Sequence, residues 1–119
     1  MKFKSVFFDH ENRTFTILDG TKGEYKVDDI LRYGIFNEKA KYKGKGVPFT
    51  AVIPRGPGAP GLFYSQLYVG LKITLKDESV LAIYVSQEQT QVGTDQYVRD
   101  DKEAKEIYNN IKELLETNK

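Results

Sequence analysis

The sequence predicts a mainly β domain with one C-terminal α-helix. Apolar and polar residues alternate along 66–76, which is typical of a strand with one buried face. After residue 100 the apolar spacing becomes that of a helix. The segments before residue 86 resemble strands without an intervening helical pattern, which favours antiparallel pairing and argues against βαβ units. A length of 119 residues fits a single domain over 1–119.

The N-terminal third predicts three strands and a bend. Aromatic and β-branched residues at 3–8 and 14–18 flank a polar turn, which indicates a β-hairpin. An Asp-Gly pair marks a second turn at 19–23, and a strand resumes at 24–27. Residues 30–37 alternate, but Arg32, Gly34 and Asn37 do not fit a uniformly buried strand, so an edge or a bend is expected there.

The C-terminal half predicts a long hairpin, a loop and the helix. The run at 80–85 is apolar on both faces, so we expect it to pair with 66–76 and to be the more central strand. Polar residues at 87–100 indicate a loop. The helix is expected over 101–117, with Asp100 and Glu103 as a capping box. Its apolar stripe is Ala104, Ile107, Tyr108, Ile111, Leu114 and Leu115.

An amphipathic helix after a strand-rich segment suggests how the apolar sheet face is covered. The economical arrangement is an antiparallel β-barrel or sandwich of roughly six to seven strands, capped by the helix.

Composition argues against most enzyme classes. The chain has no cysteine, which excludes disulfides, thiolate nucleophiles and cysteine-bound metals and fits a cytoplasmic location. The only histidine, His10, lies in a turn without a plausible catalytic partner. Adjacent carboxylates are interpreted as turns and a helix cap: Asp28 with Asp29, Asp77 with Glu78, and Asp100 with Asp101. No enzyme activity, metal or cofactor is therefore expected. Neither a signal peptide nor an apolar run of about 18 residues is apparent.

Charge is distributed unevenly, although the net charge is only +1. Residues 39–76 hold no acidic residue and seven basic ones: Lys39, Lys41, Lys43, Lys45, Arg55, Lys72 and Lys76. In an extended chain, the lysines of 39–45 would point in one direction. We select Lys39, Lys41, Lys43, Lys45 and Arg55 as candidate anion-binding or partner-binding residues. The alternative is a solvated edge strand that lysine protects from aggregation.

The segment at 54–61 is rich in proline and glycine. It is either a connector or a lip beside a binding surface, and whether 47–64 form strands or an exposed loop stays open.

Several segments resemble a group of small bacterial pleckstrin-homology-like (PH-like) domains. They are residues 8–15 at the first hairpin, 25–30, the Gly/Pro-rich middle, 71–77 and the helix at 104–115. The resemblance implies a PH-like β-barrel or sandwich and a role in binding, scaffolding or self-association. Phosphoinositide-binding members carry basic residues around the first hairpin loop. Here the loop holds Asp9 and Glu11, so phosphoinositide recognition there is not expected.

The functional hypothesis is a non-enzymatic, cytoplasmic binding or scaffolding module that contacts a protein partner or a second copy of itself. The alternative is a weak binder of anionic lipid or another polyanion through the lysines of 39–45. Nucleic acid is not expected as a partner, because a net charge of +1 is small for a nucleic-acid-binding protein.

Overall fold

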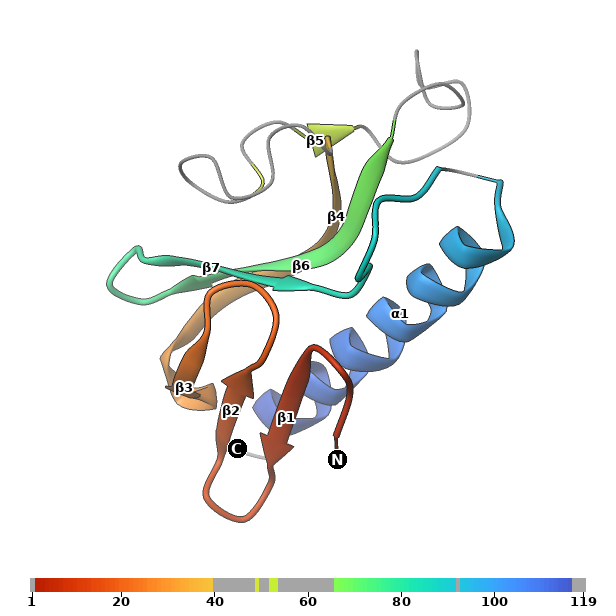
Figure 1. Ribbon diagram of the computed structural model, residues 1–119. Helices are drawn as coiled ribbons and strands as arrows, with labels where there is room; N and C mark the ends of the chain where they lie inside the picture. Colours follow the sequence, from red (N-terminus) through yellow and green to blue (C-terminus); the bar gives the residue numbers. More distant parts are fainter. Residues whose placement is uncertain (1, 40–48, 50–51, 54–65, 92, 117–119) are drawn as a thin grey trace.

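The computed structural model describes residues 2–39, 49, 52–53, 66–91 and 93–116, without the side chains of Lys39, Val52 and Ile53 (Figure 1). The N-terminal elements are β1 (Val6–Asp9), β2 (Thr14–Ile17), β3 (Gly23–Lys26) and the 3₁₀ helix η1 (Val27–Asp29). They are followed by β4 (Ile30–Lys39), β5 (Val52–Ile53), β6 (Leu67–Leu75), β7 (Val80–Tyr84) and α1 (Asp95–Glu116). The prediction of a mainly β fold with a C-terminal helix is confirmed.

The strands form two antiparallel sheets. One sheet has the order β1-β2-β3, and the other has the order β5-β4-β6-β7. Figure 1 shows the three-stranded sheet and α1 on the same side of the four-stranded sheet. The main core lies between these layers. The strands of the described residues do not close into a barrel.

The alternation along β6 determines which of its faces is buried. Side chains at the odd positions 67–75 are buried in the main core, and those of Tyr68 and Lys72 on the other face are half-exposed. The hairpin of β6 and β7 is confirmed, with Leu71 opposite Ile83 and Ile73 opposite Leu81. We call the side of the four-stranded sheet that faces α1 its inner face and the opposite side its outer face.

The prediction that the run at 80–85 is central is wrong. β7 is the last strand of its sheet, yet both of its faces are buried. The turn after β2 supplies the missing neighbour: Thr21 N donates to Ala82 O at 2.9 Å, and Tyr84 N donates to Asp19 O at 3.0 Å. These bonds join the two sheets, and Phe49 covers the outer side. A strand that is apolar on both faces is therefore buried, but it need not be a central strand of its sheet.

The edge or bend expected in the segment 30–37 corresponds to an irregularity at its start, whereas Asn37 is buried. The register of β4 against β6 shifts between Ile30 and Arg32, and Leu31 is exposed at this point. Beyond the shift, Tyr33 and Ile35 turn toward the main core, and their neighbours turn to the outer face. Among the described residues, β5 pairs with Asn37 and Glu38.

The helix begins earlier than predicted. Thr94 is the N-cap residue, because its Oγ1 accepts a hydrogen bond from Tyr97 N at 3.2 Å and its carbonyl accepts one from Val98 N at 3.1 Å. The expected start at 101 and the capping box at Asp100 are therefore wrong, and the predicted loop over 87–100 is wrong for 95–100, which belong to α1. The first turns are polar because they extend past most of the core. Among 95–99, only Tyr97 packs against it.

The apolar stripe of α1 docks on the sheet as expected. Ala104, Ile107, Ile111 and Leu114 are buried in the same cluster as Leu71 and Ile73. The helix contacts β6, β4 and η1. Within the described residues, no helix is both long and apolar enough to cross a membrane.

Candidate functional site

The lysines selected from the sequence lie mostly outside the described residues. This applies to Lys41, Lys43, Lys45 and Arg55. Lys39 is the last residue of β4, and its side chain is also outside the description. Lys72 and Lys76 of the same acid-free stretch are described, and Lys72 lies on the outer face of β6.

Strand register brings a second set of residues together on this outer face. Arg32 is opposite Thr74, Gly34 is opposite Lys72, and Phe36 is opposite Gly70. Because side chains alternate along a strand, Arg32, Phe36 and Lys72 all project to the outer face. The remaining positions of this face in β4, β6 and β7 are Glu38, Tyr68, Val80, Ala82 and Tyr84.

A small aromatic cluster occupies the β5 end of this face. The ring of Phe49 stacks on Tyr84 with centroids 5.4 Å apart, and it lies 6.1 Å from the ring of Phe36. Gly70 makes this possible, since a Cβ there would lie 2.8 Å from Phe49 Cζ and 2.4 Å from Ile83 O. Phe49 is only 3% exposed, so the cluster is a second, smaller core.

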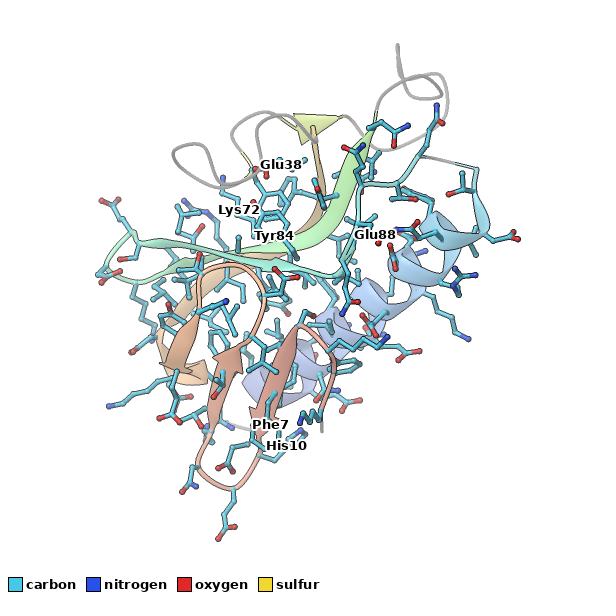
Figure 2. The ribbon with its side chains drawn as sticks, in the orientation of Figure 1. Phe7, His10, Glu38, Lys72, Tyr84 and Glu88 are labelled. Atoms are coloured by element: carbon cyan, nitrogen blue, oxygen red, sulfur yellow. The ribbon has the colours of Figure 1, made fainter. Side chains whose placement is uncertain are left out.

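The carboxylate of Glu38 is the polar centre of that cluster. It is 1% exposed, and it accepts hydrogen bonds from Tyr84 OH at 2.6 Å and Phe49 N at 2.5 Å. Figure 2 shows Glu38, Lys72 and Tyr84 on the outer side of the sheet. Burial, together with the hydrogen bond to Glu38 and its negative charge, raises the pKa of Tyr84. The buried carboxylate of Glu38 therefore has a structural role.

A shallow hollow of about 120 Å³ lies at the other end of the outer face. It is lined by Arg32, Tyr33, Gly34, Phe36, Lys72 and Thr74. The Lys72 ammonium lies 6.0 Å from the centroid of the Phe36 ring, at the limit of a cation–π contact. β4, β6 and β7 together carry only one carboxylate among their described side chains. It belongs to Glu38, which is buried and hydrogen-bonded. The hollow is therefore a cationic site with an aromatic wall.

A larger groove of about 560 Å³ lies between the start of α1, the residues after β7 and the N-terminal segment. Its lining residues are Lys4, Val85, Gln87, Glu88, Gln96, Arg99, Asp100 and Glu103. Two cations and three carboxylates therefore share one concave surface. Asp100 Oδ2 accepts a hydrogen bond of 2.8 Å from Ser86 Oγ, and Gln96 Nε2 donates to the carbonyl of Glu88 at 3.1 Å.

The electrostatics of this groove favour no single class of ligand. Burial raises the pKa of Glu103, the negative charges of Asp100 and Glu106 raise it further, and Lys4 opposes the shift. Neighbouring charges of both signs reduce the field that a ligand would meet. The outer face is therefore the stronger candidate, because its described side chains include cations and no carboxylate other than the buried Glu38.

Other titratable groups singled out in the sequence have structural partners. His10 Nε2 lies 3.1 Å from Asn110 Oδ1, which ties the first hairpin to α1. Arg13 pairs with Asp28 at 2.8 Å, and Asp77 Oδ1 accepts a hydrogen bond from Ser79 N at 2.9 Å. The interpretation of Asp77 as a turn residue is confirmed. The described residues contain no group of His, Cys, Asp or Glu that could hold a metal ion.

In comparisons with known proteins, no family model, curated protein or solved structure matches the chain. The candidate site therefore depends on the structure alone. Sequence reasoning missed Arg32 and Phe36, although both lie in the alternating segment 30–37. Their spacing of four residues in a strand places them on one face, and this signal could have identified them.

Proposed function

We propose that the chain is a non-enzymatic binding and scaffolding module of PH-like fold that docks an acidic segment of a protein partner. The docking surface is the outer face of the four-stranded sheet. Two antiparallel sheets followed by a C-terminal helix support the PH-like assignment. The core shared by the two sheets also supports it, because the sheets of a sandwich pack together through side chains on their inner faces.

The observation that carries the proposal is the placement of Arg32 and Lys72 on one sheet face beside Phe36. Both cations extend from rigid strands, and Phe36 is half-buried, so an apolar surface accompanies the charge. Complementary charge steers a partner and determines its orientation, and an aromatic side chain supplies contact area. This combination suits a protein segment better than a diffuse anionic surface, which needs charge alone.

The structural roles of the titratable groups support a binding role over catalysis. Asp28, Glu38 and Asp100 each hold a hydrogen bond that joins two segments of the chain. A general base must instead be free to accept a proton from a substrate. The cysteine-free composition adds to this, since it removes thiolate chemistry.

The second candidate function is weak binding to anionic lipid or another polyanion through Lys39, Lys41, Lys43, Lys45 and Arg55. The uneven charge of the sequence favours it, because residues 39–76 hold seven basic residues and no acidic one. Each lysine near an anionic membrane could contribute about 1 kcal/mol at low ionic strength.

Affinity capture with matched variants tests the proposal. The parent chain, the double variant Arg32→Gln/Lys72→Gln and the control Lys26→Gln/Lys102→Gln are used to capture proteins from native lysate. Both double variants lose two positive charges, but the control residues lie on β3 and α1. Captured proteins are identified by mass spectrometry, purified and titrated by calorimetry. We expect an acidic partner that binds the outer-face variant at least about tenfold more weakly than the parent and the control.

Equal affinity of the parent and the outer-face variant would contradict the proposal. Sedimentation with acidic vesicles tests the second candidate function, using a variant with Glu at Lys39, Lys41, Lys43 and Lys45. Vesicle binding by the parent that this variant loses would favour a membrane-surface role. Analytical ultracentrifugation of the same proteins determines whether the partner is a second copy of the chain.

A further inference from the structure

The hollow on the outer face lies where β4 lacks a side chain. Gly34 sits between Arg32 and Phe36 on this face, directly opposite Lys72. A Cβ at Gly34 would lie 3.0 Å from Phe36 Cε2, so the edge of the phenyl ring lies beside the space that a side chain at Gly34 would occupy. The result is a notch with a backbone floor, an aromatic wall and a cation on each side.

The size of the notch limits what it can hold. Its volume is about 120 Å³. Small-molecule pockets have volumes of about 300–1,000 Å³, so a nucleotide or a similar cofactor would not fit. A hollow of this size is suited to one short side chain.

The charges determine which side chain is complementary. Arg32 and Lys72 are diagonal neighbours across the β4–β6 pair. Cα atoms in such positions are typically about 7–8 Å apart. Both side chains are long enough to reach a carboxylate between them, and its two oxygens offer one acceptor to each cation. The methylene group that bears the carboxylate would lie against the ring of Phe36.

Resting on the binding function proposed above, we infer that this notch holds the carboxylate side chain of one Asp or Glu from the partner as an anchor. The guanidinium of Arg32 and the ammonium of Lys72 clamp the carboxylate, and Phe36 packs against its methylene group. The absence of a side chain at Gly34 is what admits the anchor. The site therefore selects its ligand by shape as well as by charge, whereas a simple electrostatic surface selects by charge alone.

An NMR titration tests the anchor directly. The probes are a capped tetraglutamate peptide and, as an uncharged control, capped tetraglutamine. We expect tetraglutamate to shift the amide signals of Arg32, Gly34, Phe36 and Lys72 at millimolar concentration, with tetraglutamine inactive. If these signals do not move with tetraglutamate, the inference is wrong.

Filling the notch separates shape from charge. Gly34→Val keeps both cations but occupies the space between them, and we expect it to weaken tetraglutamate binding about tenfold. Lys72→Gln should weaken binding to a similar degree. Lys102→Gln, which removes one charge from the exposed side of α1, should leave the affinity unchanged. Gly34→Ala is the second variant if valine prevents folding, since only a small movement of Phe36 admits its methyl group.

The outcomes also distinguish this inference from the proposed function. If Gly34→Val binds like the parent while Lys72→Gln binds weakly, the outer face acts through charge and the notch has no role. The proposed function would then stand without its anchor. If the native partner in the capture experiment tolerates loss of Arg32 and Lys72, the proposed function fails, whatever the peptide does.

Discussion

The carboxylate of Glu38 on β4 accepts a hydrogen bond of 2.6 Å from the hydroxyl of Tyr84 on β7, although these strands are not neighbours. β6 lies between them, and Gly70, which is paired with Tyr84, has no side chain to separate the two groups. The bond thus spans three strands on the outer face. Because Glu38 also accepts a hydrogen bond from Phe49 N, the same carboxylate holds the small aromatic core in place.

The first prediction is that Tyr84→Phe destabilises the fold. Losing the hydroxyl leaves one oxygen of the buried Glu38 carboxylate without its donor, which should lower the free energy of unfolding by about 1–3 kcal/mol. Urea denaturation measures the change. The control is Tyr108→Phe, which removes the hydroxyl of a half-buried tyrosine at a different site. Equal effects of the two substitutions would show that the hydrogen bond between Glu38 and Tyr84 stabilises the fold no more than the hydroxyl of Tyr108 does.

The second prediction concerns alkaline pH. Burial, and then the hydrogen bond and charge of Glu38, raise the pKa of Tyr84 above its ordinary value. Above about pH 10 the unfolded chain therefore loses this proton more readily than the folded protein does. The stability that Tyr84 contributes is complete below that pH and declines as the pH rises further.

Urea denaturation of the parent and Tyr84→Phe checks this sign between about pH 9 and pH 11. The difference in unfolding free energy between the two proteins should shrink as the pH rises. Tyr33, whose pKa is also raised by burial, is present in both proteins, and its contribution cancels in the comparison. A difference that grows with pH would contradict the assignment.

The third prediction is that the helix contributes strongly to the core. Ile111 is 0% exposed, and Ile111→Ala should lower the free energy of unfolding by about 2–5 kcal/mol, because it removes apolar contacts and leaves a cavity. Val98 is 61% exposed on the same helix. Val98→Ala should change stability by about 0.5 kcal/mol at most. Chemical denaturation measures both, and a small effect at Ile111 would mean that the helix is accessory.

The fourth prediction concerns the close approach of the two sheets at Gly20. A Cβ there would lie 2.0 Å from Ala82 O, and φ is +125°. Gly20→Ala should therefore destabilise by more than about 4 kcal/mol or prevent folding. Gly93 also has a positive φ of +94°, but a Cβ there would meet nothing within 4 Å. Gly93→Ala should cost only the backbone strain, about 1–2 kcal/mol. Similar losses in the two variants, measured by thermal unfolding, would remove the close approach as the cause.

The sequence by itself determined the local elements. Alternation along β6 and the helical spacing from Ala104 to Leu114 are short-range properties, since each reflects the side-chain period of one element. The same reasoning placed the first hairpin and the turn at Asp77. It failed at the start of α1, because the first turns pack only Tyr97 against the core and otherwise present polar residues to solvent. A helix end of that kind has no apolar period to detect.

Only the tertiary structure decided which elements meet. β7 is buried although it is the last strand of its sheet, because the main core covers its inner face, Phe49 covers its outer face, and the turn at 19–21 pairs with its edge. That pairing joins residues about 60 positions apart. The outer-face site has the same origin, since Arg32 and Lys72 become neighbours only through the register of β4 against β6. Periodicity specifies the face on which a side chain lies. Which residue lies opposite that side chain on the neighbouring strand depends on how the whole core packs, and a local sequence pattern does not contain this information.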